Sequence, residues 1–275
     1  MNAPQIRYPR LRTLLRIALL VLLLLAAAIG LGNAFKYTHW SGFVPVQAPL
    51  HGGKSTPTVG LLGGVAIHIP PYVADYPEFD GDPTWVHWPL HKQSGAASTS
   101  IRRFGFLLQH PNMQVVNDHG LRSQARKALE LEADHPWLLA QVVSNEQFPG
   151  PEALRRFVRE RVPDEADWPA LPPPVHTGLV QLKPSPVAPH GEATTAHGGS
   201  PDDRHLAYDT EGQLLAYVAC SNDPVLPRYC LQVWSLEGRG WPVLVSVSYR
   251  RTLQADWALI QRGATEALLA MRVSP

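Results

Sequence analysis

Short stretches of alternating apolar and polar positions predict a domain rich in β-strands. Residues 64–69 alternate in this way, and residues 101–108 carry the apolar pattern of a strand that Pro111 ends. In the last third of the chain, the segments QLLAYVAC, CLQVWSL and PVLVSVSYRR predict three further strands. Between residues 69 and 101 we expect one long loop.

Apolar positions at steps of three and four predict helices over residues 121–131, 151–162 and 252–271. The strands follow one another in hairpins and do not alternate regularly with helices, so the predicted fold class is α+β, with antiparallel strands and packed helices. Residues 171–203 are rich in Pro, His and Gly. We interpret them as a connection between two subdomains or as an excursion of the chain.

The N-terminus carries a candidate membrane segment. Residues 17–35 hold no charged side chain and, as a helix, would span roughly 28 Å, close to the thickness of a bilayer core. Four arginines precede the segment within a cytoplasmic tail, residues 1–16, and the positive-inside rule then exports the rest of the chain. The alternative is a signal peptide cleaved after the small residues 32–34, which leaves the compartment unchanged.

Residues 36–58 mix Pro, Gly and small polar residues and predict a flexible stalk, followed by an exported domain over residues 59–275. The chain is 45% hydrophobic and contains eight tryptophans, which is typical of a globular core. Without the four N-terminal arginines, 20 basic residues face 23 acidic ones, a balance of −3. This balance argues against nucleic acid or an anionic lipid surface as the ligand.

The chain has two cysteines, Cys220 and Cys230. In an oxidising compartment two cysteines most simply form one disulfide, and we predict that bond here. Their spacing differs from the C-x-x-C motif of redox proteins, so a structural role is favoured.

The known catalytic motifs are incomplete in this sequence. HGGKST lacks the first glycine of a phosphate-binding loop, and Ser200 lacks the glycine that follows the nucleophile in G-x-S-x-G. The twelve histidines form no local cluster with the spacing of a zinc site. The sequence therefore predicts no catalytic residues, no metal and no cofactor.

An acidic group follows the first alternating strand, at Glu78, Asp80 and Asp82. Its spacing does not fit a calcium loop, which needs a glycine and a late glutamate at fixed positions. Three interpretations stay open: paired carboxylates for acid–base chemistry, a solvated turn, or a loop that contacts a partner.

Three segments together resemble a known family. GGVAIHIPPYVADYPEFDGDPTW, IRRFGFLLQHPNM and, after the cysteines, VLVSVSYRRTLQADWALIQRGATEALLAM are similar to periplasmic immunity proteins that accompany phospholipase effectors of the type VI secretion system. The resemblance covers most of residues 59–273. This chain departs from the family in having no lipidation cysteine and in its segment rich in Pro and His.

The resemblance implies a protein that is not an enzyme, is held in the inner membrane with its domain in the periplasm, and inhibits a secreted lipase or phospholipase by stoichiometric binding. The acidic loop would then supply charges and aromatic anchors. The predicted partner-binding residues are Glu78, Asp80, Asp82, Trp85 and Trp88. The alternatives are an envelope hydrolase with a site such as Ser200, Asp202 and His205, or a structural or assembly factor of the cell envelope.

Overall fold

The computed structural model describes residues 55–81, 99–131, 134–145, 148, 150–162, 178–182, 203–222 and 228–273. All of them belong to one compact unit, Ala48–Pro275. The predicted membrane segment 17–35 and most of the predicted stalk lie outside the described residues. Within the described ranges, no helix is both long and apolar enough to cross a bilayer.

Strands and helices alternate irregularly along the described chain. The strands are β1 (Thr58–Leu62), β2 (Val65–Ile69), β3 (Asp75–Phe79), β4 (Ser100–Gln109), β5 (Gln114–Val115), β6 (Trp137–Val143), β7 (Leu179–Gln181), β8 (Asp203–Tyr208), β9 (Leu214–Cys220), β10 (Tyr229–Ser235) and β11 (Leu244–Arg250). The helices are α2 (His119–Leu131), α3 (Ala153–Arg159) and α4 (Trp257–Leu269), with 3-10 turns η4 (Glu237–Arg239) and η5 (Arg251–Asp256).

Eleven strands of the described chain form one sheet in the order β2-β1-β4-β6-β11-β10-β9-β8-β7, and β3 and β5 also pair with β4. Neighbouring strands are antiparallel, except that β1 and β4 are parallel over a short stretch. The broad α+β class is therefore confirmed. Two subdomains stay a prediction, while strands before and after residues 171–203 belong to the same sheet.

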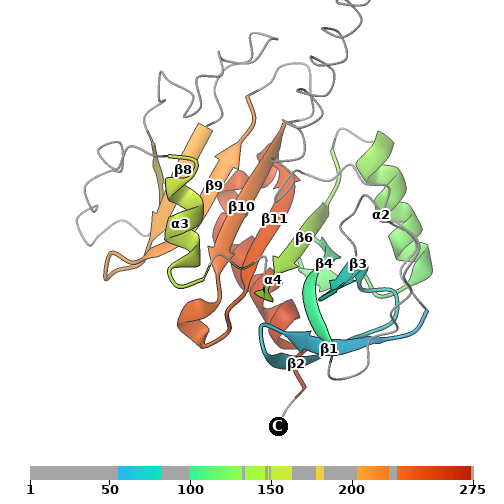
Figure 1. The fold of residues 1–275 in the computed structure, drawn as a ribbon. Coiled ribbons are helices and arrows are strands. Elements are labelled where there is room, and N and C mark those ends of the chain that lie inside the picture. Colours follow the sequence, from blue (N-terminus) through green and yellow to red (C-terminus); the bar gives the residue numbers. More distant parts are fainter. Residues whose placement is uncertain are drawn as a thin grey trace, which may run out of the picture. The chain divides into compact units, whose positions relative to one another are not determined.

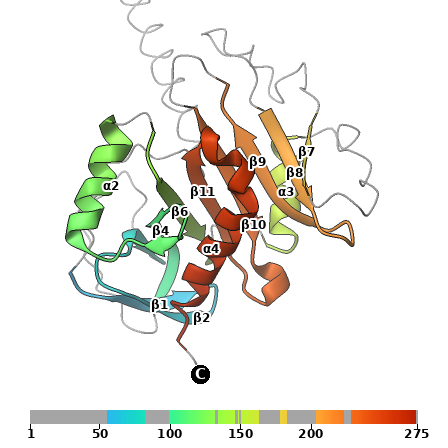
Figure 2. The ribbon, with the colours of Figure 1, turned by 180° about the vertical axis from the view of Figure 1, so that it is seen from behind.

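Helix α4 covers one face of the sheet (Figure 2) and buries its apolar stripe of Ile260, Ala264 and Leu268 there. Side chains alternate along a strand, so β11 presents Val245 and Val247 to this same core. Buried polar groups in this layer are hydrogen-bonded across elements. For example, the Trp234 indole donates to Thr265 Oγ1 over 3.0 Å, and the Tyr249 hydroxyl donates to Gln232 Oε1 over 3.1 Å.

Helices α2 and α3 lie on the opposite face (Figure 1). Ala125 and Ala128 of α2 pack in a smaller cluster with Trp137 of β6. Phe157 of α3 meets Tyr217 of β9 edge-on, with ring centroids 5.8 Å apart. The two halves of the sheet are thus covered by different helices on this face.

The last third of the chain folds as predicted. The three expected strands are β9, β10 and β11, and the expected helix is η5 followed by α4. The helices expected over residues 121–131 and 151–162 are α2 and α3, and the strands expected over residues 64–69 and 101–108 are β2 and β4.

Several strands were not expected. The single long loop predicted between β2 and β4 contains strand β3, and β6 lies between the predicted helices 121–131 and 151–162, where no strand was expected. Strand β7 falls within the predicted connection 171–203, and β1 begins at Thr58, the last residue of the predicted stalk. The domain therefore has a larger sheet than the sequence indicated.

Candidate functional site

The predicted acidic group lies in residues 75–82, called the acidic segment below. This segment begins with a buried ion pair. Asp75, the first residue of β3, accepts a hydrogen bond from Nη2 of Arg122 on α2, and both side chains are almost fully buried. Nη1 of Arg122 also donates to the carbonyl of Tyr72 over 2.6 Å. Burial and, to a lesser degree, Arg126 lower the pKa of Arg122 to about 10, so it stays charged at neutral pH. The pair fixes α2 to the start of the acidic segment.

Glu78 is a strand residue and is paired inside the domain. It lies on β3, where its Oε1 accepts a hydrogen bond from Nη2 of Arg103 and its Oε2 is 3.8 Å from Nη2 of Arg102. Both arginines come from the neighbouring strand β4. The expectation that Glu78 lies in a loop is therefore wrong, because strand pairing extends through it.

Asp80 occupies the turn after β3 and is also tied to the domain. Its backbone amide donates to the carbonyl of Ser100 over 2.9 Å, and its Oδ2 accepts a hydrogen bond of 3.3 Å from Nδ2 of Asn145. Asn145 adopts a left-handed backbone conformation, with φ of 50°, that asparagine tolerates better than most residues. The turn is thus held against the end of β6.

The rest of the predicted contact residues, Asp82, Trp85 and Trp88, lie outside the described residues. In the part of the chain that the structure describes, no group of three or more His, Cys, Asp or Glu side chains could hold a metal ion. Asp75, Glu78 and Asp80 each have a separate internal partner. The described carboxylates therefore hold the segment to the rest of the domain. They do not share one site, as paired carboxylates in acid–base catalysis do.

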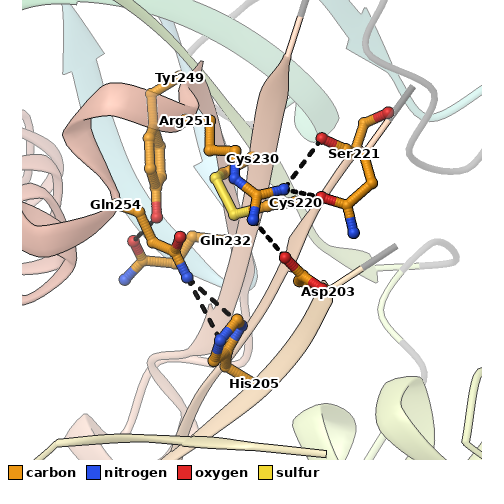
Figure 3. Close-up of a disulfide and its surroundings, with 10 residues drawn as sticks. Asp203, His205, Cys220, Ser221, Cys230, Gln232, Tyr249, Arg251 and Gln254 are labelled. Carbon is orange, nitrogen blue, oxygen red and sulfur yellow. Dashed lines mark hydrogen bonds and ion pairs between the residues drawn. A yellow bond between two sulfur atoms is a disulfide. The ribbon is translucent and has the colours of Figure 1, made fainter. Parts of the chain in front are cut away.

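The predicted disulfide between Cys220 and Cys230 is confirmed (Figure 3). The two residues lie opposite each other on β9 and β10, with a Cα–Cα distance of 4.0 Å, and both are buried. The bond therefore joins two neighbouring strands in the part of the sheet that the sequence predicted.

Arg251 organises a polar cluster beside the disulfide (Figure 3). Its guanidinium pairs with Asp203 of β8, contacts the Asn222 side chain and donates to the Ser221 carbonyl over 3.2 Å. Burial raises the pKa of Asp203, but hydrogen bonds from Asn222 and Arg251 outweigh it and hold that pKa below its usual value. The cluster fastens β8, β9 and η5 together.

His205, the candidate base of the alternative hydrolase, belongs to β8 and faces Gln254. Both ring nitrogens are 3.4 Å from Gln254 Nε2 (Figure 3). Burial lowers the pKa of His205. Ser200 and Asp202 lie outside the described residues, so the structure does not test this site, and within the described chain His205 faces the Gln254 amide.

A groove at the β2 edge of the sheet was missed by sequence reasoning. It has a volume of about 570 Å³ and is lined by Val59, Gly60, Ala66, Ile67, His68, Ala270, Met271, Arg272 and Val273. The chain after α4 forms one wall, because the His68 amide donates to the Met271 carbonyl over 2.8 Å and the Val273 amide donates to the Ala66 carbonyl over 3.0 Å. The C-terminal end of the chain accordingly lies beside β2 in both views (Figures 1 and 2).

The groove is lined by residues about 200 positions apart, so the sequence holds only one local signal for it. The alternation of residues 64–69 places Ala66 and His68 on the same, solvent-facing side of β2. Nothing in the sequence indicates that residues 270–273 pair with that strand.

Comparison with known proteins gives one structural likeness. No protein-family model and no curated protein matches the chain. An immunity protein of the Stenotrophomonas maltophilia type IV secretion system has a similar structure, with a TM-score of 0.45 and 14% sequence identity over 82% of this chain and 96% of that one. A TM-score of this size falls short of a common fold.

Proposed function

We propose that this protein is a periplasmic immunity protein that binds and inhibits a secreted toxin by stoichiometric association. The family resemblance of the sequence implies a lipase or phospholipase toxin delivered by a type VI system, whereas the similar structure belongs to a type IV system. The experiments below assume neither delivery system.

The observation that carries the proposal is a disulfide-closed domain behind a predicted export segment. Cys220 and Cys230 face each other across paired strands and are joined. Disulfides persist in oxidising compartments such as the bacterial periplasm, which is where a toxin aimed at the cell envelope would be intercepted.

The internal pairing of polar side chains supports binding over catalysis. Asp75, Glu78 and Asp203 each bond to an arginine of the same domain, and His205 lies against Gln254. A catalytic group needs a free position next to substrate, whereas these side chains hold strands and helices together.

Membrane anchoring through residues 17–35 is part of the proposal. A reporter that is active only outside the cytoplasm, fused after residue 275, should be active, and the protein should stay with membranes after a carbonate wash. A soluble form beginning near residue 35 would replace the anchor with a cleaved signal peptide.

The acidic segment is proposed as one part of the contact with the toxin. Glu78 and Asp80 are engaged within the domain, so we expect the segment beyond them, with Asp82, to offer the charge that a partner meets. The variant Asp82→Lys should slow association and change its salt dependence. Unchanged rates in the folded variant would remove the segment from the interface.

The direct test uses the full chain and the purified product of the gene adjacent to its own. We expect a one-to-one complex and loss of the toxin's ester or phosphoester hydrolysis when the two are mixed in equal amounts. Hydrolysis of such esters by this protein alone would assign it to the enzymes. The absence of both a complex and inhibition would overturn the proposal.

A further inference from the structure

We propose that the groove between the β1–β2 hairpin and residues 270–273 binds an extended segment of the toxin that carries apolar side chains and a carboxylate. This inference rests on the proposed function and names a contact surface for it. It does not depend on the acidic segment.

The groove is preformed. Met271 is buried in the main core, and the Arg272 guanidinium lies over the Trp241 ring, 5.2 Å from its centroid. The Trp241 indole in turn donates to the Leu62 carbonyl of β1 over 2.7 Å. Residues 270–273 are thus fastened to both the core and the hairpin, so binding would cost little ordering of this wall.

Apolar surface in the groove is exposed. Val59 and Ala66 line it from the hairpin, and Val273, one of two large apolar side chains exposed in the described residues, is 52% exposed. Burying such surface is a main source of binding free energy. A partner segment with apolar side chains fits this lining.

The charge of the groove is one-sided. None of its nine lining residues is acidic, whereas His68 and Arg272 are both basic and exposed. Among the described residues, no carboxylate forms an ion pair with either side chain. Complementary charge would come from an Asp or Glu of the partner, which adds specificity and a faster association rate.

The shape of the groove favours a chain segment over a small molecule. Five of the nine lining residues, Ala66, His68, Ala270, Arg272 and Val273, are exposed, so the groove is open along much of its lining. Pockets for small ligands bury most of the ligand surface, whereas an extended peptide can lie along an open groove and place alternate side chains in shallow sites.

Two groove variants with matched controls test the inference. Ala66→Trp fills the groove from an exposed position, and Ala258→Trp makes the same change on an exposed position of α4. Arg272→Glu reverses the groove charge, and Arg262→Glu makes the same reversal on α4. Binding kinetics of the full chain with the adjacent gene's product are measured, together with thermal unfolding of each variant.

We expect Ala66→Trp to weaken binding at least tenfold through faster dissociation, and Arg272→Glu to slow association severalfold, while both controls bind like the wild type. Wild-type affinity in both folded groove variants would overturn the inference while leaving the proposed function intact. No binding by the wild type would overturn the proposed function. A wild-type dimer that Ala66→Trp dissociates would give the groove to a second copy of the chain and equally overturn the inference.

Discussion

The two ends of the sheet are stabilised in different ways. At the β8–β11 end, two bonds join consecutive strands, Cys220 to Cys230 across β9 and β10 and Gln232 of β10 to Tyr249 of β11, and the Arg251–Asp203 pair spans 48 positions. At the β1–β4 end, contacts join segments much farther apart, such as the Trp241 indole to the Leu62 carbonyl and the His68 amide to the Met271 carbonyl, which are 179 and 203 positions apart.

This difference separates a stabilising half from a half that presents surface. The β8–β11 end is closed by α4 and by internal hydrogen bonds. The β1–β4 end carries the base of the acidic segment and the edge groove, and the groove joins residues 59–68 to residues 270–273. Variants that break one kind of contact should therefore differ in effect from variants that break the other.

The largest expected loss comes from the long-range end. Arg122→Met leaves Asp75 buried without its main cation and should lower the free energy of unfolding by about 3–5 kcal/mol, measured by urea denaturation. The double variant Asp75→Leu and Arg122→Met should lose less, because no buried charge is left unpaired. Lys127→Met, on the exposed side of α2, is the control. Equal losses in single and double variants would contradict the buried ion pair.

The stability of the fold should depend on pH through His135, which lies just before β6. His135 is buried beside Tyr229 and Asp134, and its Nε2 lies 3.2 Å from the donating Nε of Arg250. Burial, and then Arg250, lower the pKa of His135 to about 4, against the opposing effect of Asp134. The unfolded chain then binds the proton more tightly than the folded one, so this contribution is present above about pH 6.5 and is lost as pH falls toward 4.

Between pH 6.5 and pH 4 the free energy of unfolding should fall by about 3 kcal/mol, because the pKa of His135 is lowered from 6.5 to about 4 in the folded protein. Urea denaturation at a series of pH values compares the wild type with His135→Gln. The difference between the two curves should change between pH 6.5 and 4. Parallel curves would show that His135 does not titrate with this lowered pKa.

Removing the disulfide tests the locally stabilised end. Cys220→Ala with Cys230→Ala should reduce the free energy of unfolding by about 2–3 kcal/mol, because the short loop gains freedom in the unfolded chain. The wild type measured with and without reductant under denaturing conditions gives the same comparison without a substitution. Two titratable thiols in the unreduced, denatured wild type would be incompatible with this bond.

The smallest expected effect is at Glu78. Glu78→Gln keeps the shape of the side chain but weakens its pairing with Arg103 and Arg102 at a partly exposed site. We expect a loss of about 1 kcal/mol, read from the urea midpoint, that shrinks in high salt. A loss as large as that of Arg122→Met would mean that Glu78 is as critical as the buried Asp75 pair.

Sequence reasoning succeeded where the signal is local. Strands β9, β10 and β11 alternate or are rich in β-branched residues, and α4 carries its apolar residues at helical spacing. The cysteine pairing followed from their number and the predicted compartment. These elements need no knowledge of distant neighbours.

Sequence reasoning failed where contacts between distant segments decide the structure. Strand β6, WLLAQVV, is an apolar run with both faces mostly covered, and periodicity does not distinguish such a strand from a buried helix. Strand β3, DYPEF, contains a proline and two acids, and becomes a strand by pairing with β4 and through the Arg122 and Arg103 ion pairs. The groove depends on residues 270–273 meeting β2, which no local pattern encodes.

Protection of living cells tests the central claim most directly. The product of the adjacent gene is directed to the periplasm of a test strain that carries the wild-type chain, Ala66→Trp or Ala258→Trp at equal amounts in the envelope. We expect the wild type and Ala258→Trp to restore growth and Ala66→Trp to protect less. Cell death in the presence of the wild-type chain, at a level equal to that of cells without it, would contradict the immunity function.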